Sequence, residues 1–291
     1  MNAHGLKYPI PFAKMSGTGN DFIVIDHREP FIAEADQSEF ARIVCRRKFS
    51  VGADGLILIE NSETADFRWQ FYNGDGSRAE MCGNGARCAA RFAFEKNIAP
   101  ANMRFETTAG EIEAFVLSET GESVKIRLTS PEDLRLNIPM SIGNVEQKLH
   151  FINTGVPHTV VLVNDTGDVP VAEWGREIRF HETFQPAGTN ANFAQVVSSD
   201  TLMVRTYERG VEGETMACGT GAVASALVVA LLEQAVPPLT VITSGGEELT
   251  IHFSLTGEKN HRQLDPAKGI YLEGPAHLIY EGQLGIDGVQ E

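Results

Sequence analysis

The chain has 291 residues, of which 42% are hydrophobic and 22% are charged, a balance typical of globular proteins and unlike that of disordered ones. Its formal net charge of −15 argues against binding to nucleic acid or to an anionic membrane surface, because both carry phosphate groups that would be repelled. The length exceeds what one hydrophobic core usually supports, so two domains are expected.

The sequence shows no targeting or membrane-spanning segment. Residues 1–12 contain no basic stretch followed by an apolar run, and the longest apolar stretch, residues 222–232, is interrupted by Ser225 and is too short to cross a bilayer. A cytoplasmic protein is therefore expected. In such a protein the four cysteines are expected to be free thiols rather than a disulfide framework.

Strands are predicted where short runs rich in β-branched or aromatic residues are bounded by Gly, Asp or Ser. In chain order these runs are residues 22–26, 56–60, 67–72, 112–117, 124–128, 159–163, 192–197, 202–207, 239–243 and 249–253. Helices are predicted over residues 86–96 and 222–234. The second helix is apolar almost all round, which indicates burial on most sides, as inside a curved sheet.

Short motifs recur at a constant offset of 136 residues, which indicates an internal duplication. Thr18-Gly19 returns as Thr154-Gly155, and Cys82-Gly83 returns as Cys218-Gly219. A junction is expected near residues 130–133, where Ser-Pro-Glu-Asp separates two strand-like runs. The predicted domains are residues 1–130 and 131–276. Residues 277–291 lie beyond the second repeat and are expected to return and complete the first domain.

Each recurring cysteine stands directly before a glycine-rich helix start. A helix N-terminus carries partial positive charge and unpaired N–H groups, so it lowers the pKa of a thiol and can hold a carboxylate. Free cysteine is often only a buried packing residue, but recurrence at the repeat offset favours a functional role for Cys82 and Cys218. Cys45, in the basic helical stretch 42–48, and Cys88 have no repeat partner and are assigned to structure.

Two other uses of the thiols fit the sequence less well. The spacing from Cys82 to Cys88 is not a zinc pattern, so no metal site is expected. A thiol redox enzyme is also conceivable, but the chain has no Cys-x-x-Cys element. No lysine stands in a context that suggests a Schiff base, so no pyridoxal cofactor is expected either.

Several motifs, taken together, resemble the diaminopimelate epimerase family. They are Ser-Gly-Thr-Gly-Asn-Asp-Phe at 16–22, Asn-Gly-Asp-Gly-Ser at 73–77, Cys-Gly-Asn-Gly-Ala-Arg at 82–87, Gly-Val-Pro-His at 155–158, Tyr-Glu-Arg-Gly at 207–210 and Ala-Cys-Gly-Thr-Gly at 217–221. The resemblance covers nearly the whole chain. It implies an α/β (α+β) fold of two pseudo-symmetric domains, each a curved, mostly antiparallel sheet or barrel around a central helix.

The resemblance also implies a reaction and the residues that perform it. The family interconverts LL- and meso-diaminopimelate, in lysine and peptidoglycan precursor biosynthesis, without a cofactor: one cysteine thiolate removes the α-proton and the other thiol protonates the opposite face. It implies that His158 and Glu208 are the partners of Cys82 and Cys218 respectively. Implied substrate-binding residues are Asn20, Asn73, Gly83, Asn84, Asn190, Glu208, Arg209, Gly219 and Thr220.

Read alone, these residues have simpler explanations. Asn20 and Asn73 fit turns, Glu208-Arg209 fits an exposed ion pair, and His158 fits a strand end. Gly55 and Val156 depart from one common version of the family pattern, which affects the contacts to the far end of the substrate rather than the proton chemistry.

The implied partners are a small-molecule substrate and a second copy of the chain, as a homodimer. Two further function classes remain open. One is a related cofactor-independent racemase acting on proline, hydroxyproline or histidine, although proline-racemase-like sequences would carry His where Asn84 and Thr220 stand. The other is a non-catalytic amino-acid-binding protein on the same scaffold.

Overall fold

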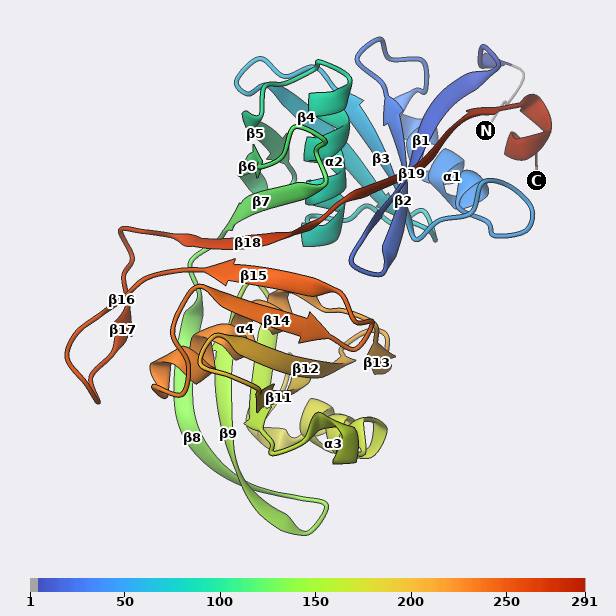
Figure 1. Ribbon diagram of the computed structural model, residues 1–291. Coiled ribbons are helices and arrows are strands. Elements are labelled where there is room, and N and C mark those ends of the chain that lie inside the picture. The colour runs from blue at the N-terminus through green and yellow to red at the C-terminus, as the bar shows by residue number, and fades with distance from the viewer. Residues whose placement is uncertain (1–4, 291) are drawn as a thin grey trace. The chain divides into compact units, whose positions relative to one another are not determined.

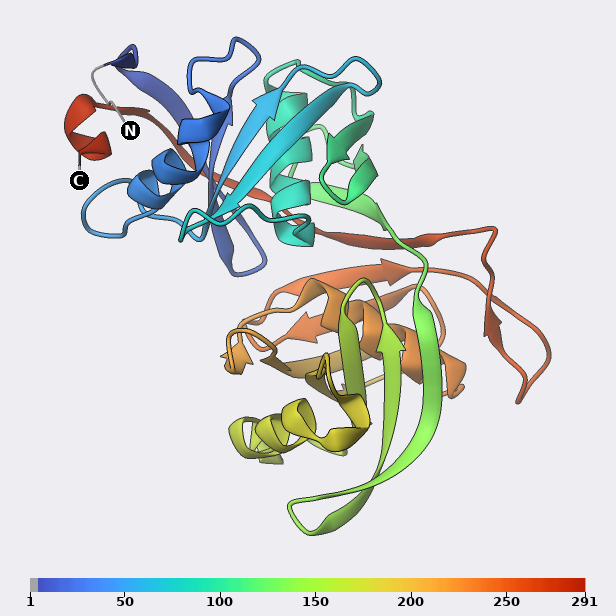
Figure 2. The same cartoon turned by 180° about the vertical axis from the view of Figure 1, so that it is seen from behind.

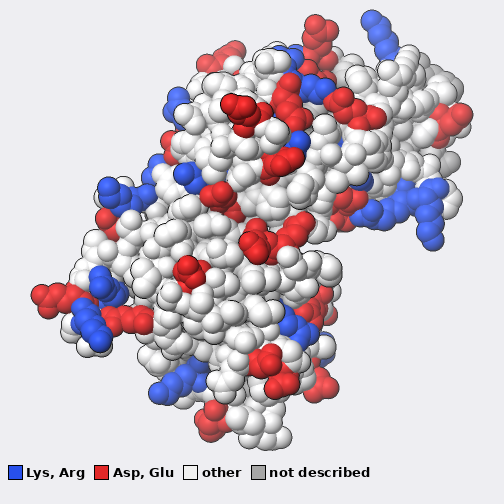
Figure 3. Space-filling model, viewed as in Figure 1, with Lys and Arg blue, Asp and Glu red and all other residues white. Residues whose placement is uncertain are grey.

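The computed structural model describes residues 5–290, and the chain divides into two compact units. Unit 1 consists of the described residues up to Ile126 together with those from Gly274 onward. Unit 2 consists of Arg127–Glu273. None of the helices in the described part of the chain is long and apolar enough to span a membrane. Both acidic and basic side chains are visible on the face drawn in Figure 3.

Unit 1 is a curved sheet with two helices (Figure 1). Its elements are β1 (Ile10–Gly17), β2 (Asn20–Asp26), α1 (Glu34–Val44), β3 (Gly55–Glu60), β4 (Phe67–Asn73), α2 (Gly83–Glu95), β5 (Asn102–Thr107), β6 (Gly110–Val116), β7 (Ser123–Leu128), β19 (His277–Leu284) and the 3-10 helix η4 (Ile286–Val289). The pairs β2–β3 and β4–β5 are parallel, whereas β19–β1, β1–β2, β3–β4, β5–β6 and β6–β7 are antiparallel. Parallel neighbours need a crossover connection, and α1 and α2 supply the two crossovers.

Unit 2 repeats this plan (Figure 2). Its elements are β8 (Glu132–Ile142), β9 (Val145–Asn153), β10 (Pro157–Leu162), η2 (Thr166–Asp168), α3 (Val171–Phe180), η3 (Glu182–Phe184), β11 (Asn190–Val196), β12 (Thr201–Glu208), β13 (Gly213–Thr215), α4 (Gly219–Leu231), β14 (Leu239–Thr243), β15 (Glu248–His252), β16 (Leu255–Thr256), β17 (Gln263–Leu264) and β18 (Ile270–Pro275). Here β10–β11 and β12–β14 are the parallel pairs, with α3 and α4 as crossovers. The two units share one order of parallel and antiparallel neighbours, which confirms the predicted duplicated fold.

The central helix of each unit packs against several strands. Helix α2 contacts β1, β2, β3 and β6, and helix α4 contacts β9, β10, β11, β12, β14 and β15. Every residue of α4 from Gly221 to Ala230 is buried. The predicted burial of this apolar helix is therefore confirmed, because strands cover it on nearly all sides.

Both central helices differ in length from the prediction. They begin at Gly83 and Gly219, three residues earlier than predicted, because the glycine-rich segments form the first helical turn rather than a loop. Helix α4 also ends earlier, at Leu231. Glu233 takes a left-handed conformation with φ 59°, and the N–H of Gln234 turns back to donate to the carbonyl of Val229, which terminates the helix.

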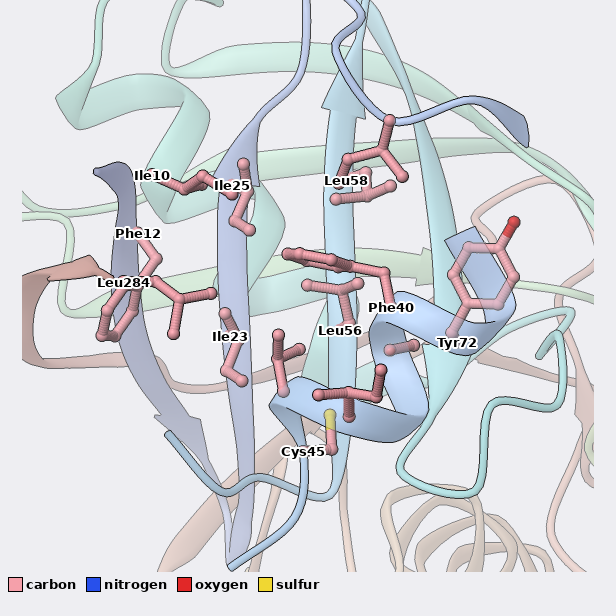
Figure 4. Close-up of a cluster of buried hydrophobic side chains, with 14 of the residues drawn as sticks. Ile10, Phe12, Ile23, Ile25, Phe40, Cys45, Leu56, Leu58, Tyr72 and Leu284 are labelled. Carbon is pink, nitrogen blue, oxygen red and sulfur yellow. The ribbon is translucent and has the colours of Figure 1, made fainter. Parts of the chain in front are cut away.

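The C-terminal segment pairs with the first strand of unit 1. Strand β19 pairs antiparallel with β1 in a register that sets Leu284 opposite Ile10. Figure 4 shows both side chains in one buried cluster with Ile25 and Phe40. The closing strand therefore contributes a side chain to the core of unit 1 as well as backbone hydrogen bonds.

Cys45 belongs to the same core (Figure 4). The predicted helical stretch 42–48 is wrong in its extent: α1 ends at Val44, Cys45 is its C-cap, and Lys48 has a positive φ of 72°. Burial raises the pKa of the Cys45 thiol to about 12. Cys88 is fully buried within α2, so the structure agrees with a packing role for both cysteines.

Candidate active site

Cys82 and Cys218 occupy the same position in the two units. Each is the N-cap of its central helix, with extended φ of −146° for Cys82 and −127° for Cys218. Their carbonyls accept the first helical hydrogen bonds, from the N–H groups of Ala86 at 2.8 Å and Ala222 at 2.9 Å. Both cysteines are partly exposed. The partial positive charge of a helix N-terminus favours the ionised form of a thiol placed there.

In unit 1 the start of α2 lies against the β1–β2 turn. Thr18 and Gly19 have φ of 48° and 86°, as a two-residue hairpin turn of the I′ type requires. The buried amide of Asn84 donates from Nδ2 to Asn20 Oδ1 at 2.9 Å and to the Thr18 carbonyl at 3.4 Å, and its Oδ1 accepts from Arg87 Nη2 at 3.0 Å. Two predicted binding residues, Asn20 and Asn84, therefore lie at the N-terminal end of α2. Gly83, the first residue of this helix, directly follows Cys82.

Asn20 is held from its other side by a charged network. Its Nδ2 donates to Asp54 Oδ2 at 3.1 Å, and Arg47 bridges Asp54 Oδ1 at 2.9 Å and Asp21 Oδ1 at 2.6 Å. Burial raises the pKa of Asp21, but hydrogen bonds from Arg47 and Lys14 outweigh this and lower it to about 2. Asp21 therefore stays ionised at neutral pH and holds Arg47, which in turn holds Asp54 beside the Asn20 amide.

Asn73 lies at the exposed end of β4 and takes part in local turn bonding. Its Nδ2 donates to Ser77 Oγ at 3.0 Å, and its carbonyl accepts from the N–H of Gly76 at 2.9 Å. It stands opposite Gly55 in the β3–β4 register. A Cβ at residue 55 would lie 2.7 Å from a ring carbon of Phe71, so the packing at this departure from the family pattern requires glycine.

In unit 2 the start of α4 carries a histidine contact. Thr220 Oγ1 lies 2.9 Å from His158 Nε2 and 3.6 Å from Cys218 Sγ. On the other side of the ring, Asn192 Nδ2 donates to His158 Nδ1 at 3.1 Å. Burial, together with the positive charge of Arg209, lowers the pKa of His158 to about 3, so the imidazole is neutral at physiological pH.

The β9–β10 turn repeats the unit 1 contact. Gly155 has a φ of 102°, and Thr154 Oγ1 donates to the carbonyl of Thr220 at 3.1 Å. Thr154 and Thr220 stand at the repeat offset from Thr18 and Asn84, so each unit fastens its turn to the second residue of its central helix. Val156 lies within this turn, where its carbonyl accepts from the N–H of Thr154 at 3.2 Å.

Glu208 and its neighbours form the remaining part of the unit 2 site. Glu208 Oε2 accepts from Thr215 Oγ1 at 2.9 Å, and burial raises the pKa of this carboxyl. The amide of the buried Asn190 accepts from the N–H of Arg209 at 2.7 Å and donates to the Pro157 carbonyl at 3.0 Å. Asn190 therefore ties the ends of β10, β11 and β12 together.

Sequence reasoning missed Asn192, Thr206, Arg87 and Asp54, which hold the predicted residues in place. For Asn192 and Thr206 the sequence holds no clear signal, because β11 and β12 each carry other polar residues as well. Asn192 and Thr206 are 0% and 4% exposed on β11 and β12. Among the residues that the structure describes, no group of three or more His, Cys, Asp or Glu side chains is arranged to hold a metal ion.

Comparison with solved structures gives the same fold at low sequence identity. A phenazine biosynthesis protein of the PhzF family from Bacillus anthracis is 17% identical, with a TM-score of 0.71 over 95% of this chain and 99% of that one. A hydroxyproline epimerase from Agrobacterium vitis is 15% identical, with a TM-score of 0.67 over 97% and 94%. These likenesses confirm the predicted fold.

Comparison of sequences is more specific. The family model described as diaminopimelate epimerase matches residues 12–132 and 150–276. A protein named diaminopimelate epimerase from Aquifex aeolicus is 50% identical, over 94% of this chain and 97% of that protein. Another protein of that name, from a Hydrogenobaculum species, is 44% identical over 94% of this chain and 98% of that protein. With both cysteines at the helix starts of a duplicated fold, the chain belongs to the diaminopimelate epimerase family.

Proposed function

We propose that this protein is an isomerase that interconverts LL- and meso-2,6-diaminopimelate, a step in making lysine and peptidoglycan precursors. The observation that carries the proposal is the pair of partly exposed thiols, Cys82 and Cys218, at equivalent helix N-termini. The substrate is supported by full-length relatives of that name, from 36% to 50% identical.

The proposed reaction is proton transfer with two bases. One thiolate removes the α-proton, and the other thiol delivers a proton to the opposite face of the planar carbanion. Two groups are needed because a single base would have to reach both faces. The roles of Cys82 and Cys218 exchange with the direction of the reaction.

The carbanion needs electrostatic stabilisation, because its charge spreads onto the α-carboxylate. We assign this to the N–H groups of Gly83, Asn84, Gly219 and Thr220, which belong to the first turns of α2 and α4. First-turn N–H groups have no partner within the helix and lie at the positive end of its dipole. No cofactor is required in this scheme.

The remaining predicted roles are proposals on the same basis. His158 and Glu208 are assigned to adjust the protonation of Cys82 and Cys218 respectively. Asn20, Asn73, Asn190, Glu208 and Arg209 are assigned to hold the amino and carboxylate groups of the substrate. The local bonds described above support Asn20 most directly, because Asp54 and Asn84 fix its amide from two sides.

We also propose that the protein acts as a homodimer in the cytoplasm, where reducing conditions keep both thiols active. Strand β19 exposes Ile279 at 56% and Tyr280 at 45%, which is apolar surface that a second copy can cover. Sedimentation equilibrium tests the dimer against the 31.7 kDa of one chain.

The alternative functions are less well supported. The likeness to a hydroxyproline epimerase is 15% identical and shows the fold alone, and Asn84 and Thr220 stand where a proline-racemase-like sequence would carry His. A non-catalytic binding protein has no need for two thiols at helix N-termini.

The function is tested by incubating the reduced protein in D₂O with a panel of amino acids, without pyridoxal phosphate or metal. Stereochemistry and α-deuterium are then read by chiral chromatography and mass spectrometry. The expected result is deuterium incorporation with inversion for diaminopimelate and none for proline, hydroxyproline or histidine. Absence of exchange with diaminopimelate would refute the proposal, and exchange with another panel member would identify the alternative racemase.

A further inference from the structure

Three buried polar side chains lie beneath the start of α4. His158, Asn192 and Thr206 are at most 4% exposed and come from the adjacent strands β10, β11 and β12. Thr206 Oγ1 donates to Asn192 Oδ1 at 2.9 Å, and Asn192 Nδ2 donates to His158 Nδ1 at 3.1 Å. Burying polar groups costs free energy that their hydrogen bonds only partly offset. Their presence beneath a helix therefore requires a reason.

The equivalent positions in unit 1 show that the fold itself does not require polar side chains beneath the helix. The strand pairing identifies the equivalent positions. Phe22 pairs with Gly55 in unit 1, and His158 pairs with Asn190 in unit 2. Ile57 pairs with Phe71 in unit 1, and Asn192 pairs with Thr206 in unit 2. The unit 1 counterparts of the polar trio are thus Phe22, Ile57 and Phe71. All three are at most 4% exposed. The same architecture is satisfied there by apolar packing alone.

The glycine in the first turn of each central helix confirms the equivalence. A Cβ at Gly85 would lie 3.3 Å from Ile57 Cδ1, and a Cβ at Gly221 would lie 2.3 Å from Asn192 Oδ1. Residues 57 and 192 therefore occupy the same place against their helices. In unit 2 the amide of Asn192 fills that place, and it lies so close to the helix that residue 221 can have no Cβ.

The direction of the hydrogen bonds follows from the donors available. Asn192 Nδ2 also donates to the Thr159 carbonyl at 2.9 Å, which can only accept, so this atom is the amide nitrogen. His158 Nδ1 must then accept, and the neutral ring carries its proton on Nε2. The Nε2–H donates to Thr220 Oγ1. The hydroxyl proton of Thr220 is consequently available to the Cys218 sulfur at 3.6 Å.

We propose that Asn192, His158 and Thr220 form a directed hydrogen-bond relay that stabilises the thiolate of Cys218. The relay rests on the proposed function, in which Cys218 is one of the two bases. Thr220, His158 and Asn192 act as positioning residues, since each works through its neighbour on the sulfur. The charged groups on the surrounding strands are Arg209, whose positive charge adds to the effect of burial in lowering the pKa of the imidazole, and Glu208, which accepts from Thr215.

The relay is specific to one half of the duplicated molecule. At the equivalent helix position in unit 1, both amide hydrogens of Asn84 are engaged by Asn20 and the Thr18 carbonyl. The family resemblance assigns the imidazole of His158 to Cys82, whereas within unit 2 its Nε2–H is engaged by Thr220.

The test measures the thiol directly and requires no substrate. In a Cys82→Ala background, the rate of iodoacetamide alkylation at Cys218 is followed against pH by peptide mass spectrometry. Thr220→Val and Asn192→Leu should each raise the pKa of the Cys218 thiol by about one unit, the scale of one hydrogen bond to a charged group. Thr220→Ser, which keeps the hydroxyl, should restore the original profile.

Two controls separate the relay from packing. Thr154→Val removes a hydroxyl that donates to the Thr220 carbonyl and not to the sulfur, so it should leave the profile unchanged. The ¹⁵N chemical shifts of His158 should report the Nε2–H tautomer in the unsubstituted protein. Asn192→Leu leaves His158 Nδ1 and Thr206 Oγ1 without this partner, so its melting temperature should fall, and circular dichroism must show the variant folded at the assay temperature.

Three results would overturn the relay: an unchanged alkylation profile in Thr220→Val, an equal shift in Thr154→Val, or an Nδ1–H tautomer of His158. Failure of the proposed epimerase function would appear separately, as missing deuterium exchange with an intact thiol profile. A shifted profile in folded variants, with the Nε2–H tautomer of His158, would support the relay whatever the substrate proves to be.

Discussion

The Nε2 atom of His158 lies 2.9 Å from the hydroxyl of Thr220, two residues beyond Cys218 at the start of α4. Asn192 donates a hydrogen bond to the other ring nitrogen, so both nitrogens of the imidazole are hydrogen-bonded within unit 2. Because the ring is buried, the stability of the protein should depend on pH.

His158 should make the protein sensitive to acid. Its pKa is lowered from 6.5 to about 3 in the folded state, so the folded protein resists binding a proton that the unfolded chain accepts. The free energy of unfolding is therefore fully retained above pH 6.5 and falls as the pH drops from 6.5 toward 3. In His158→Phe, which installs the unit 1 residue, this loss should be smaller when urea unfolding is measured across the same range. An identical loss in both proteins would show that His158 is not the buried neutral group.

Gly221→Ala should disturb the site, whereas Gly85→Ala should not. The added Cβ would meet Asn192 Oδ1 at 2.3 Å in unit 2, but only a movable methyl of Ile57 at 3.3 Å in unit 1. Overpacking of this kind costs about 1–3 kcal/mol. We expect Gly221→Ala to lose about ten-fold or more in kcat and to raise the pKa of the Cys218 thiol, with Gly85→Ala near the parent. Equal behaviour of the two variants would argue against a special role for Asn192.

How much of this site the sequence predicts depends on the kind of residue. Cys82 and Cys218 were predictable because a constant repeat offset places them at matching helix starts. Asn192 and Thr206 were not, because a polar residue within a strand run is indistinguishable in sequence from one on a solvent-facing side. Only the strand register shows that they replace Ile57 and Phe71 in a buried place.

The fold was predictable to a similar extent. Strands with one buried face, such as β12 and β14, show the expected alternation. The hairpin β8–β9 was not among the predicted strands, although every second residue of β8 from Leu134 to Ile142 is apolar. Pro139 lies within this run, and a proline argues against a strand in a sequence-based prediction. Helix α3 was missed because only three of its ten residues are buried. The early starts of α2 and α4 were missed because glycine in a sequence usually indicates a turn rather than a helix.

The closing strand β19 should be essential for the stability of unit 1. Leu284 is 6% exposed in the core and Gln283, its neighbour, is exposed. Leu284→Ala should lower the free energy of unfolding by about 2–4 kcal/mol, the usual cost of emptying a buried leucine site. Gln283→Ala should change it by no more than about 0.5 kcal/mol. A small effect of Leu284→Ala in urea unfolding would mean that the C-terminal segment does not hold the core.

Glu208 should destabilise the folded protein as it ionises. Burial raises its pKa above 4.5, so the folded state binds the proton more tightly than the unfolded chain does. The favourable contribution is present below pH 4.5 and is lost as the pH rises through the raised pKa. Glu208→Gln should therefore become more stable relative to the parent with rising pH, while kcat falls. A stability difference that does not change with pH would contradict this assignment.

The paired-thiol mechanism is tested most directly by single cysteine variants in the epimerisation assay. Removing an acid or base usually costs about a hundred-fold to ten-thousand-fold in rate, so Cys82→Ala and Cys218→Ala should each lose at least about a hundred-fold in kcat with LL-diaminopimelate. Cys45→Ala, which alters a core packing residue, serves as the matched control and should keep its activity. Loss of epimerisation in both site variants, with the control active, is the expected result. Undiminished activity in either Cys82→Ala or Cys218→Ala would contradict the two-base mechanism.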